Sequence, residues 1–190
     1  MNPPESKSRL REAAGQRLKE LTEHQRHDAS KAICHRLQQL SREVGGCVLG
    51  FLPLPGEIDL EPYLRHRLGE GVAVPLVNWS TREMCPVLLK GLGTDDLEAD
   101  RHGLRKPVDP TPVSLETIEL VVVPGLAFNH ECLRLGRGGG YYDRLLPGLS
   151  TGTRTIGICF DEQLVDDIPV EAWDQPVDEV LTPTQHFQSS

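Results

Sequence analysis

The stretch of the sequence best suited to chemistry is a run of glycine and arginine at residues 133–144. It reads LRLGRGGGYYDR, and four of its glycines fall within five residues. Glycine lets backbone N–H groups turn toward an anion because no Cβ obstructs them. The guanidinium groups of Arg134, Arg137 and Arg144 offer planar forks that match phosphate oxygens. The pattern predicts a phosphate-binding loop.

This loop follows neither of the two common nucleotide motifs. No Gly-Lys-Ser/Thr occurs, which excludes the P-loop, and Tyr141 stands where the dinucleotide fingerprint needs glycine. Tyr141 and Tyr142 could pack on a flat ring or donate hydrogen bonds, and Asp143 could hold Mg²⁺ through oxygen. A flexible turn with solvated arginines is the structural alternative.

The elements around this loop predict an α/β fold. Ile118 to Pro124 reads IELVVVP, a β-branched run typical of a strand covered on both faces. Residues 1–44 read as helical, with a capping box at Thr22–Gln25. Further expected elements are strands over 47–52, 72–77, 84–89, 155–160 and 177–181 and a helix over 60–68. We expect one domain over residues 1–190, a three-layer αβα sandwich with a largely parallel sheet and a Rossmann-like but non-standard nucleotide loop.

Composition narrows the classes of function. The 190 residues carry a formal net charge of −8, which argues against a general nucleic-acid binder. No apolar run is long enough to span a bilayer, and the N-terminus lacks the form of a signal peptide. Five cysteines without paired spacing indicate reduced thiols rather than disulfides or a zinc site. We expect a cytoplasmic protein with no membrane partner.

Two features have no predicted role in the chemistry. Residues 91–112 are polar and rich in Gly, Asp and Pro, so we interpret them as a long surface excursion. Trp79 and Trp173 are interpreted as packing residues.

The run VVVPGLAFNHECLRLGRGGGYYDRLL closely resembles the signature of 5-formyltetrahydrofolate cyclo-ligases, approximately PGLAFD followed by RLGYGGGYYDR. The resemblance extends over nearly the whole chain. Lys7 to Arg11 is similar to the family's K-x-x-L-R, FLP with GEID at residues 51–59 to its first-strand segment, and VDEVLT at 177–182 to its last strand. Two departures are Asn129, where many members have Asp, and Gly139, where some have Lys.

The resemblance implies roles for individual residues. Lys7, Arg137 and Tyr142 would be catalytic, and Leu52 and Glu57 would contact the folate. Asp143, and with it Asp174, would hold Mg²⁺. The implied ATP contacts are Lys7, Arg11, Arg134, Gly136, Arg137, Gly138, Gly139, Gly140, Tyr141 and Tyr142; of these, Arg137, Gly138, Gly139, Gly140 and Tyr141 would also face the folate.

The implied activity is the ATP- and Mg²⁺-dependent conversion of 5-formyltetrahydrofolate, possibly polyglutamylated, into 5,10-methenyltetrahydrofolate. The formyl oxygen would take the γ-phosphate, and N10 would then attack the activated carbon, in a monomer or a weak homo-oligomer. Two alternatives from other classes stay open. One is a sugar-phosphate isomerase or acyl-CoA transferase on a related scaffold, which needs a catalytic carboxylate and no ATP. The other is a non-catalytic regulator that binds nucleotide or folate.

Overall fold

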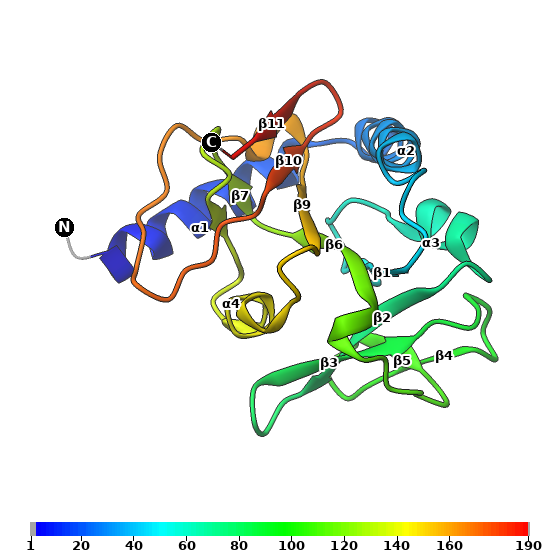
Figure 1. Ribbon diagram of the computed structural model, residues 1–190. Coiled ribbons are helices and arrows are strands. Elements are labelled where there is room, and N and C mark those ends of the chain that lie inside the picture. Colours follow the sequence, from blue (N-terminus) through cyan, green and yellow to red (C-terminus); the bar gives the residue numbers. More distant parts are fainter. Residues whose placement is uncertain (1–2, 190) are drawn as a thin grey trace.

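The computed structural model describes residues 3–189, and a mixed, mostly parallel sheet forms its centre (Figure 1). The strands of this sheet are β1 (Cys47–Leu49), β2 (Val72–Asn78), β3 (Glu83–Leu88), β6 (Ile118–Pro124), β9 (Arg154–Ile158), β10 (Glu179–Leu181) and β11 (His186–Gln188). They lie in the order β11-β10-β9-β6-β1-β2-β3. The inner strands are parallel to one another, and β3 and β11 pair antiparallel at the two edges. The prediction of an α/β fold with a largely parallel sheet is confirmed.

Helices cover both faces of the sheet. They are α1 (Pro3–Glu20), α2 (Glu23–Leu40), α3 (Glu61–Arg67) and α4 (Tyr141–Leu145). On one face, Ile33 of α2 and Tyr63 of α3 pack into a cluster with alternate residues of the strands. On the opposite face, Leu145 of α4 joins a second cluster that contains Phe128. Figure 1 shows α2 and α3 on one side of the strands and α4 on the other.

The first helix lies beside the turn that follows β9, at the carboxyl ends of the strands. Leu10 packs with Ala127, Leu135 and Ile168 in a small third cluster. Steps of three and four residues on a helix return to the same face, so Lys7, Arg11 and Ala14 follow one another along it. Ala14 is buried, and this packing holds Lys7 and Arg11 against the carboxyl edge of the sheet.

The second helix begins where its capping residues predict. The Thr22 hydroxyl accepts a hydrogen bond from the Gln25 N–H, and the Gln25 side chain accepts one from the Thr22 N–H. This reciprocal pair satisfies donors that the first turn leaves free. The helix ends at Leu40, ahead of the Gly45-Gly46 pair expected to end it.

Several expected bounds need correction. The first strand stops at Leu49 instead of residue 52, and the Gly50 N–H makes one more hydrogen bond to the Ala73 carbonyl of β2, at 2.9 Å. The largest error is at residues 91–112, where an irregular excursion was expected. This segment contains a hairpin of β4 (Leu97–Ala99) and β5 (Arg105–Pro107), whose short, charged strands give little hydrophobic alternation. A second small hairpin, β7 (Ala127–Phe128) with β8 (Arg134–Leu135), precedes residues 136–140, which we call the glycine loop.

Two further observations concern membrane-spanning helices and the state of the cysteines. No helix between residues 3 and 189 combines the length and apolar composition needed to cross a bilayer. All five cysteines are free thiols, as expected from their spacing.

Candidate functional site

A cavity of about 660 Å³ opens at the carboxyl ends of the central strands. Strand β2 lies on one side of β1 and β6 on the other, so the connections that leave β1 and β6 diverge. Such a switch point forms a crevice in an open α/β sheet, where ligands bind. Phe51 and Glu57 from the loop after β1, and Pro124 and Gly125 at the end of β6, line the cavity.

Every site residue named from the sequence lines this one cavity. They come from α1, from the loop after β1, from β8, from the glycine loop, from α4 and from the segment before β10. The residues are Lys7, Arg11, Leu52, Glu57, Arg134, Gly136, Arg137, Gly138, Gly139, Gly140, Tyr141, Tyr142, Asp143 and Asp174. Seven basic and four acidic side chains line the cavity, which gives a local excess of positive charge in a chain of net charge −8.

The glycine loop takes backbone conformations that other residues adopt at a cost. Gly138 has φ of 96° and Gly140 has φ of 66°, both in the left-handed region. Arg11 of α1 donates from Nε to the Gly136 carbonyl at 2.9 Å and so ties the loop to the first helix. The helix α4 after the loop has only five residues, so its dipole contributes little to binding an anion.

Lys7 forms an ion-pair cluster with Glu171 and Asp174, which we call the Lys7 cluster. Its Nζ lies 2.6 Å from Glu171 Oε2 and also contacts Asp174 Oδ2. Asp174 Oδ2 additionally accepts a hydrogen bond from the Glu171 N–H. Burial alone would lower the pKa of Lys7, but the hydrogen bonds and charges of Asp174 and Glu171 outweigh it and raise the pKa above 10.5. Lys7 is therefore charged at neutral pH although it is only 4 % exposed.

Glu57 and Arg137 form an ion pair across the cavity, the Glu57–Arg137 bridge. Arg137 Nη2 lies 3.0 Å from Glu57 Oε1, and its Nε also donates to this oxygen. Glu57 is held at its other oxygen by the Leu54 N–H, at 2.9 Å. The Glu57 side chain is 15 % exposed and that of Arg137 is 51 % exposed. The arginine is the exposed partner that an anionic ligand can recruit.

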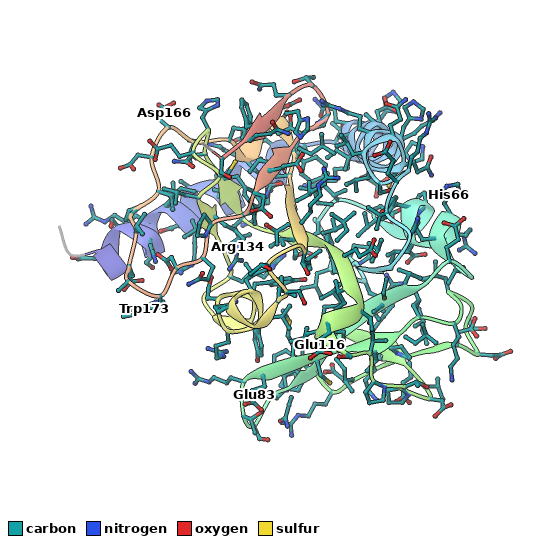
Figure 2. All side chains as sticks on the ribbon, in the orientation of Figure 1. His66, Glu83, Glu116, Arg134, Asp166 and Trp173 are labelled. Carbon is teal, nitrogen blue, oxygen red and sulfur yellow. The ribbon has the colours of Figure 1, made fainter. Side chains whose placement is uncertain are left out.

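Arg134 lies under the glycine loop. Its Nη2 binds Asp143 Oδ1 at 2.6 Å, and its guanidinium lies over the Tyr142 ring, 5.5 Å from the centroid. Figure 2 labels Arg134 near α4 in the interior of the molecule. Burial raises the pKa of the Tyr142 hydroxyl, against a smaller opposing effect of Arg134, so this hydroxyl stays protonated. It makes no hydrogen bond within residues 3–189 and can act toward a ligand as a donor.

The predicted metal ligands have the donor chemistry that Mg²⁺ prefers. Asp143 contacts Arg134 through Oδ1, and Asp174 contacts Lys7 and the Glu171 N–H through Oδ2. Residues 3–189 hold no group of three or more His, Cys, Asp or Glu side chains arranged for a metal ion. The pattern fits an ion that takes one or two carboxylates from the protein and completes its shell with phosphate oxygens and water.

The sequence analysis missed several lining residues. Trp79 and Trp173, interpreted as packing residues, line the cavity and are 36 % and 63 % exposed. Figure 2 shows Trp173 at the edge of the molecule. Arg82 and Glu171 were also missed as lining residues, whereas Arg144, predicted as part of the phosphate-binding loop, does line the cavity. For the β2–β3 hairpin a signal was present: Pro75 and Val77 alternate along β2 and share one face, and Trp79 follows them at the same spacing just after the strand ends.

Asn129, which was given no catalytic role, stabilises a turn. Its Oδ1 accepts hydrogen bonds from the N–H groups of Glu131 and Leu133, at 3.1 and 2.9 Å. Asn129 is buried and does not line the cavity.

Comparison with known proteins gives a consistent set of relatives. The model of the 5-formyltetrahydrofolate cyclo-ligase family matches residues 3–183. A 5-formyltetrahydrofolate cyclo-ligase of Mycolicibacterium smegmatis is 34 % identical over 187 residues, which cover 95 % of each chain. One from Escherichia coli K12 is 30 % identical, over 91 % of this chain and 98 % of the relative.

Solved structures agree with these relatives. The 5,10-methenyltetrahydrofolate synthetase of Aquifex aeolicus superposes with a TM-score of 0.81 at 30 % identity, over 96 % of this chain and 92 % of the other. A 5,10-methenyltetrahydrofolate synthetase from Mycoplasma pneumoniae, at 20 % identity and a TM-score of 0.72, shares the fold. Because the family model spans almost all of the described residues, the chain belongs to the 5-formyltetrahydrofolate cyclo-ligase family.

Proposed function

We propose that this chain is an enzyme that converts 5-formyltetrahydrofolate into 5,10-methenyltetrahydrofolate, using ATP and releasing ADP and phosphate. The observation that carries the proposal is the convergence of distant segments on one cavity at the switch point of the sheet. Membership of the family supplies the substrate class.

The reaction needs activation of an unreactive group. A formamide carbon is a poor electrophile, and its oxygen is a poor leaving group. Attack of the formyl oxygen on the γ-phosphate of ATP turns that oxygen into part of a phosphate ester. N10 then attacks the carbon and gives up its proton, the C–O bond breaks, and phosphate leaves as the methenyl cation forms. Phosphoryl transfer of this kind depends on positioning and charge stabilisation more than on covalent catalysis.

The residues of the cavity fit these two demands. Lys7 supplies a positive charge that its ion pairs hold in place. Arg137 supplies an exposed positive charge that can turn from Glu57 to the transferring phosphate. The backbone of Gly138 and Gly140 lets the loop approach the phosphates closely. Tyr142 can contribute a proton donor, since its hydroxyl stays protonated. Leu52 and Glu57 lie on the loop after β1, where they can contact the folate.

Magnesium would be held by Asp143 and Asp174 together with the phosphates. When bound, it supplies charge neutralisation on the phosphate oxygens. We further propose a cytoplasmic enzyme that acts as a monomer or a weak homo-oligomer and accepts polyglutamylated folate. Neither nucleic acid nor a membrane is a partner in this proposal.

The test follows the near-ultraviolet absorbance of the methenyl product, which the substrate lacks, on mixing the full chain with 5-formyltetrahydrofolate. We expect the signal only when both ATP and Mg²⁺ are present. Binding of both ligands without the signal would favour a regulator, and a signal independent of ATP would rule out phosphorylation of the formyl oxygen.

A further inference from the structure

The basic side chains that line the cavity differ in whether the protein already pairs them. Six of the seven have partners within residues 3–189, and Arg82 is the seventh. The partners are Glu171 and Asp174 for Lys7, the Gly136 carbonyl for Arg11, Glu61 for Arg105, Asp143 for Arg134, Glu57 for Arg137, and the Arg82 and Gly139 carbonyls for Arg144.

The guanidinium of Arg82 makes no hydrogen bond, ion pair or ring contact with any residue that the structure describes. Arg82 is exposed and is one of the residues that line the cavity. An unpaired arginine that lines a ligand cavity is a free binding group for an anion, because no protein contact must break first.

The backbone of Arg82 is fixed in place. The residue sits in the turn between β2 and β3 with φ of 58°, a left-handed conformation that is uncommon outside glycine. Its carbonyl accepts hydrogen bonds from Arg144 Nε at 2.9 Å and Nη2 at 2.5 Å. Arg144 also donates to the Gly139 carbonyl at 2.7 Å. Arg144 therefore fixes the hairpin turn to the end of the glycine loop.

The register of the hairpin places Arg82 beside an apolar wall. Val77 pairs with Met84, and both line the cavity with Trp79 and Arg82. This face of the hairpin therefore offers apolar surface that ends at a cation.

Trp79 is held in position by the β4–β5 hairpin. Its indole N–H donates to Asp100 at 2.6 Å, and its ring lies 4.2 Å from that of His102. On the other side, Trp79 meets Tyr141 edge-on at 6.1 Å. The segment at 91–112 thus supports the wall of the cavity, which gives this hairpin a role in the site.

The two sides of the glycine loop suit different parts of the substrates. Arg11 of α1 contacts the loop at Gly136, and the Lys7 cluster lies with it on the α1 side. Arg144 contacts the loop at Gly139 and also donates to the Arg82 carbonyl, so both arginines lie on the side of the β2–β3 hairpin. A triphosphate needs several cations and a metal ion, which the α1 side and the loop supply. A flat ring that carries a carboxylate needs an apolar wall and one arginine, which the hairpin supplies.

We propose that Arg82 binds a carboxylate of the glutamate tail of the folate, with the adjoining aromatic ring of the folate along Trp79. This proposal rests on the proposed function. It names Arg82 as the residue that makes the enzyme prefer a folate with a glutamate tail. In this proposal Arg82 contacts the tail and not the formyl group, so its contribution affects substrate binding and leaves the chemical step alone.

The test compares 5-formyltetrahydrofolate with 5-formyltetrahydropteroate, which lacks the glutamate. We expect the wild-type enzyme to have the lower KM for the glutamate-bearing substrate. In Arg82→Ala, KM for that substrate should rise by about tenfold, the worth of one charged hydrogen-bonded contact, with kcat retained. The preference for the glutamate-bearing substrate should therefore disappear. Arg82→Lys should restore part of it, because the charge returns without the planar fork.

The controls separate this proposal from the reaction itself. Arg65→Ala removes an exposed arginine of α3 that does not line the cavity, and the preference should be unchanged. Isothermal titration calorimetry measures the affinities for the two substrates without turnover. Absence of product would therefore count against the proposed reaction, and the ratio of the two affinities would still decide the role of Arg82. An Arg82→Ala enzyme that keeps the wild-type preference, or a wild type without one, would overturn the proposal.

Discussion

The Lys7 cluster and the Glu57–Arg137 bridge present positive charge to the same cavity in different ways. In the cluster one ammonium group faces two carboxylates, and the side chains of Lys7, Glu171 and Asp174 are 5 %, 17 % and 19 % exposed. In the bridge one guanidinium faces one carboxylate, and Arg137 is half exposed. The first arrangement is buried and carries excess negative charge, whereas the second is neutral and open to water.

This difference separates a cation that stabilises the fold from a cation that is free to change partners. A buried ion pair that loses one member leaves an uncompensated charge in a poor solvent, which is strongly destabilising. An exposed pair is worth little to stability because water replaces the lost partner. Loss of Lys7 should therefore damage both stability and catalysis, and loss of Arg137 should damage catalysis alone.

The largest effect is expected from Lys7→Met. Turnover should fall by about 10³-fold, because the phosphate loses a preorganised charge. The free energy of unfolding should fall by about 2 kcal/mol, less than for a fully buried pair because Glu171 and Asp174 retain some contact with water. Denaturant unfolding and the methenyl absorbance assay measure the two effects. Lys31→Met, at an exposed position of α2, is the matched control. Wild-type turnover in Lys7→Met would remove Lys7 from the mechanism.

The next effect is expected from Arg137→Ala. Turnover should fall by about 10²-fold, as for the loss of one charge-stabilising donor. The free energy of unfolding should change by no more than about 0.5 kcal/mol, because the Arg137 side chain is half exposed and Glu57 keeps its hydrogen bond from the Leu54 N–H. Arg65→Ala serves as the control. If Arg137→Ala were as destabilising as Lys7→Met, the contrast between the two ion pairs would be wrong.

The sequence predicted the parts of this site that local pattern determines. The glycine loop was predictable because its residues are adjacent, and left-handed backbone angles at Gly138 and Gly140 follow from residue type. The central strand β6 was predictable because seven consecutive residues match the pattern of a buried parallel strand. The roles implied for Lys7 and Arg11 depended on resemblance, since a Lys and an Arg four residues apart on a helix otherwise indicate a solvated face.

The parts that were missed depend on contacts between distant segments. Glu171 lies 164 residues from Lys7, and Arg144 lies 62 residues from Arg82. Trp79 was taken for a packing residue because nothing local shows that a hairpin at residues 97–107 supports it at the cavity wall. Such pairings depend on tertiary placement, which periodicity and residue type do not encode.

A smaller effect is expected from Asp143→Asn. The change weakens the magnesium ligand that we propose, so the concentration of Mg²⁺ needed for half-maximal rate should rise by at least about tenfold, a loss seen even for indirect partners of metal ligands. It also weakens the pair with Arg134. Asp95→Asn, in the segment before β4, is an exposed control that does not line the cavity. Superimposable magnesium titrations of Asp143→Asn and wild type would make the metal assignment wrong.

The smallest effect concerns the pH dependence of the Lys7 cluster. Burial opposes the charge of Lys7, but Asp174 and Glu171 raise its pKa above the unfolded value of 10.5. A group whose pKa is raised on folding stabilises the protein fully below the unfolded pKa and loses that contribution as pH rises through the folded pKa. The difference in unfolding free energy between wild type and Lys7→Met should therefore be constant at neutral pH and narrow above pH 10.5.

The subtraction between wild type and Lys7→Met isolates the cluster. Burial also raises the pKa values of Cys34 and Tyr63, so these groups destabilise both proteins at alkaline pH and cancel in the difference. The Glu57–Arg137 bridge provides the contrast, because arginine stays protonated throughout this range. The difference between wild type and Arg137→Ala should accordingly show no change above pH 10.5. If the difference in unfolding free energy from wild type decreased equally for Lys7→Met and for Arg137→Ala, the alkaline effect would arise outside the Lys7 cluster.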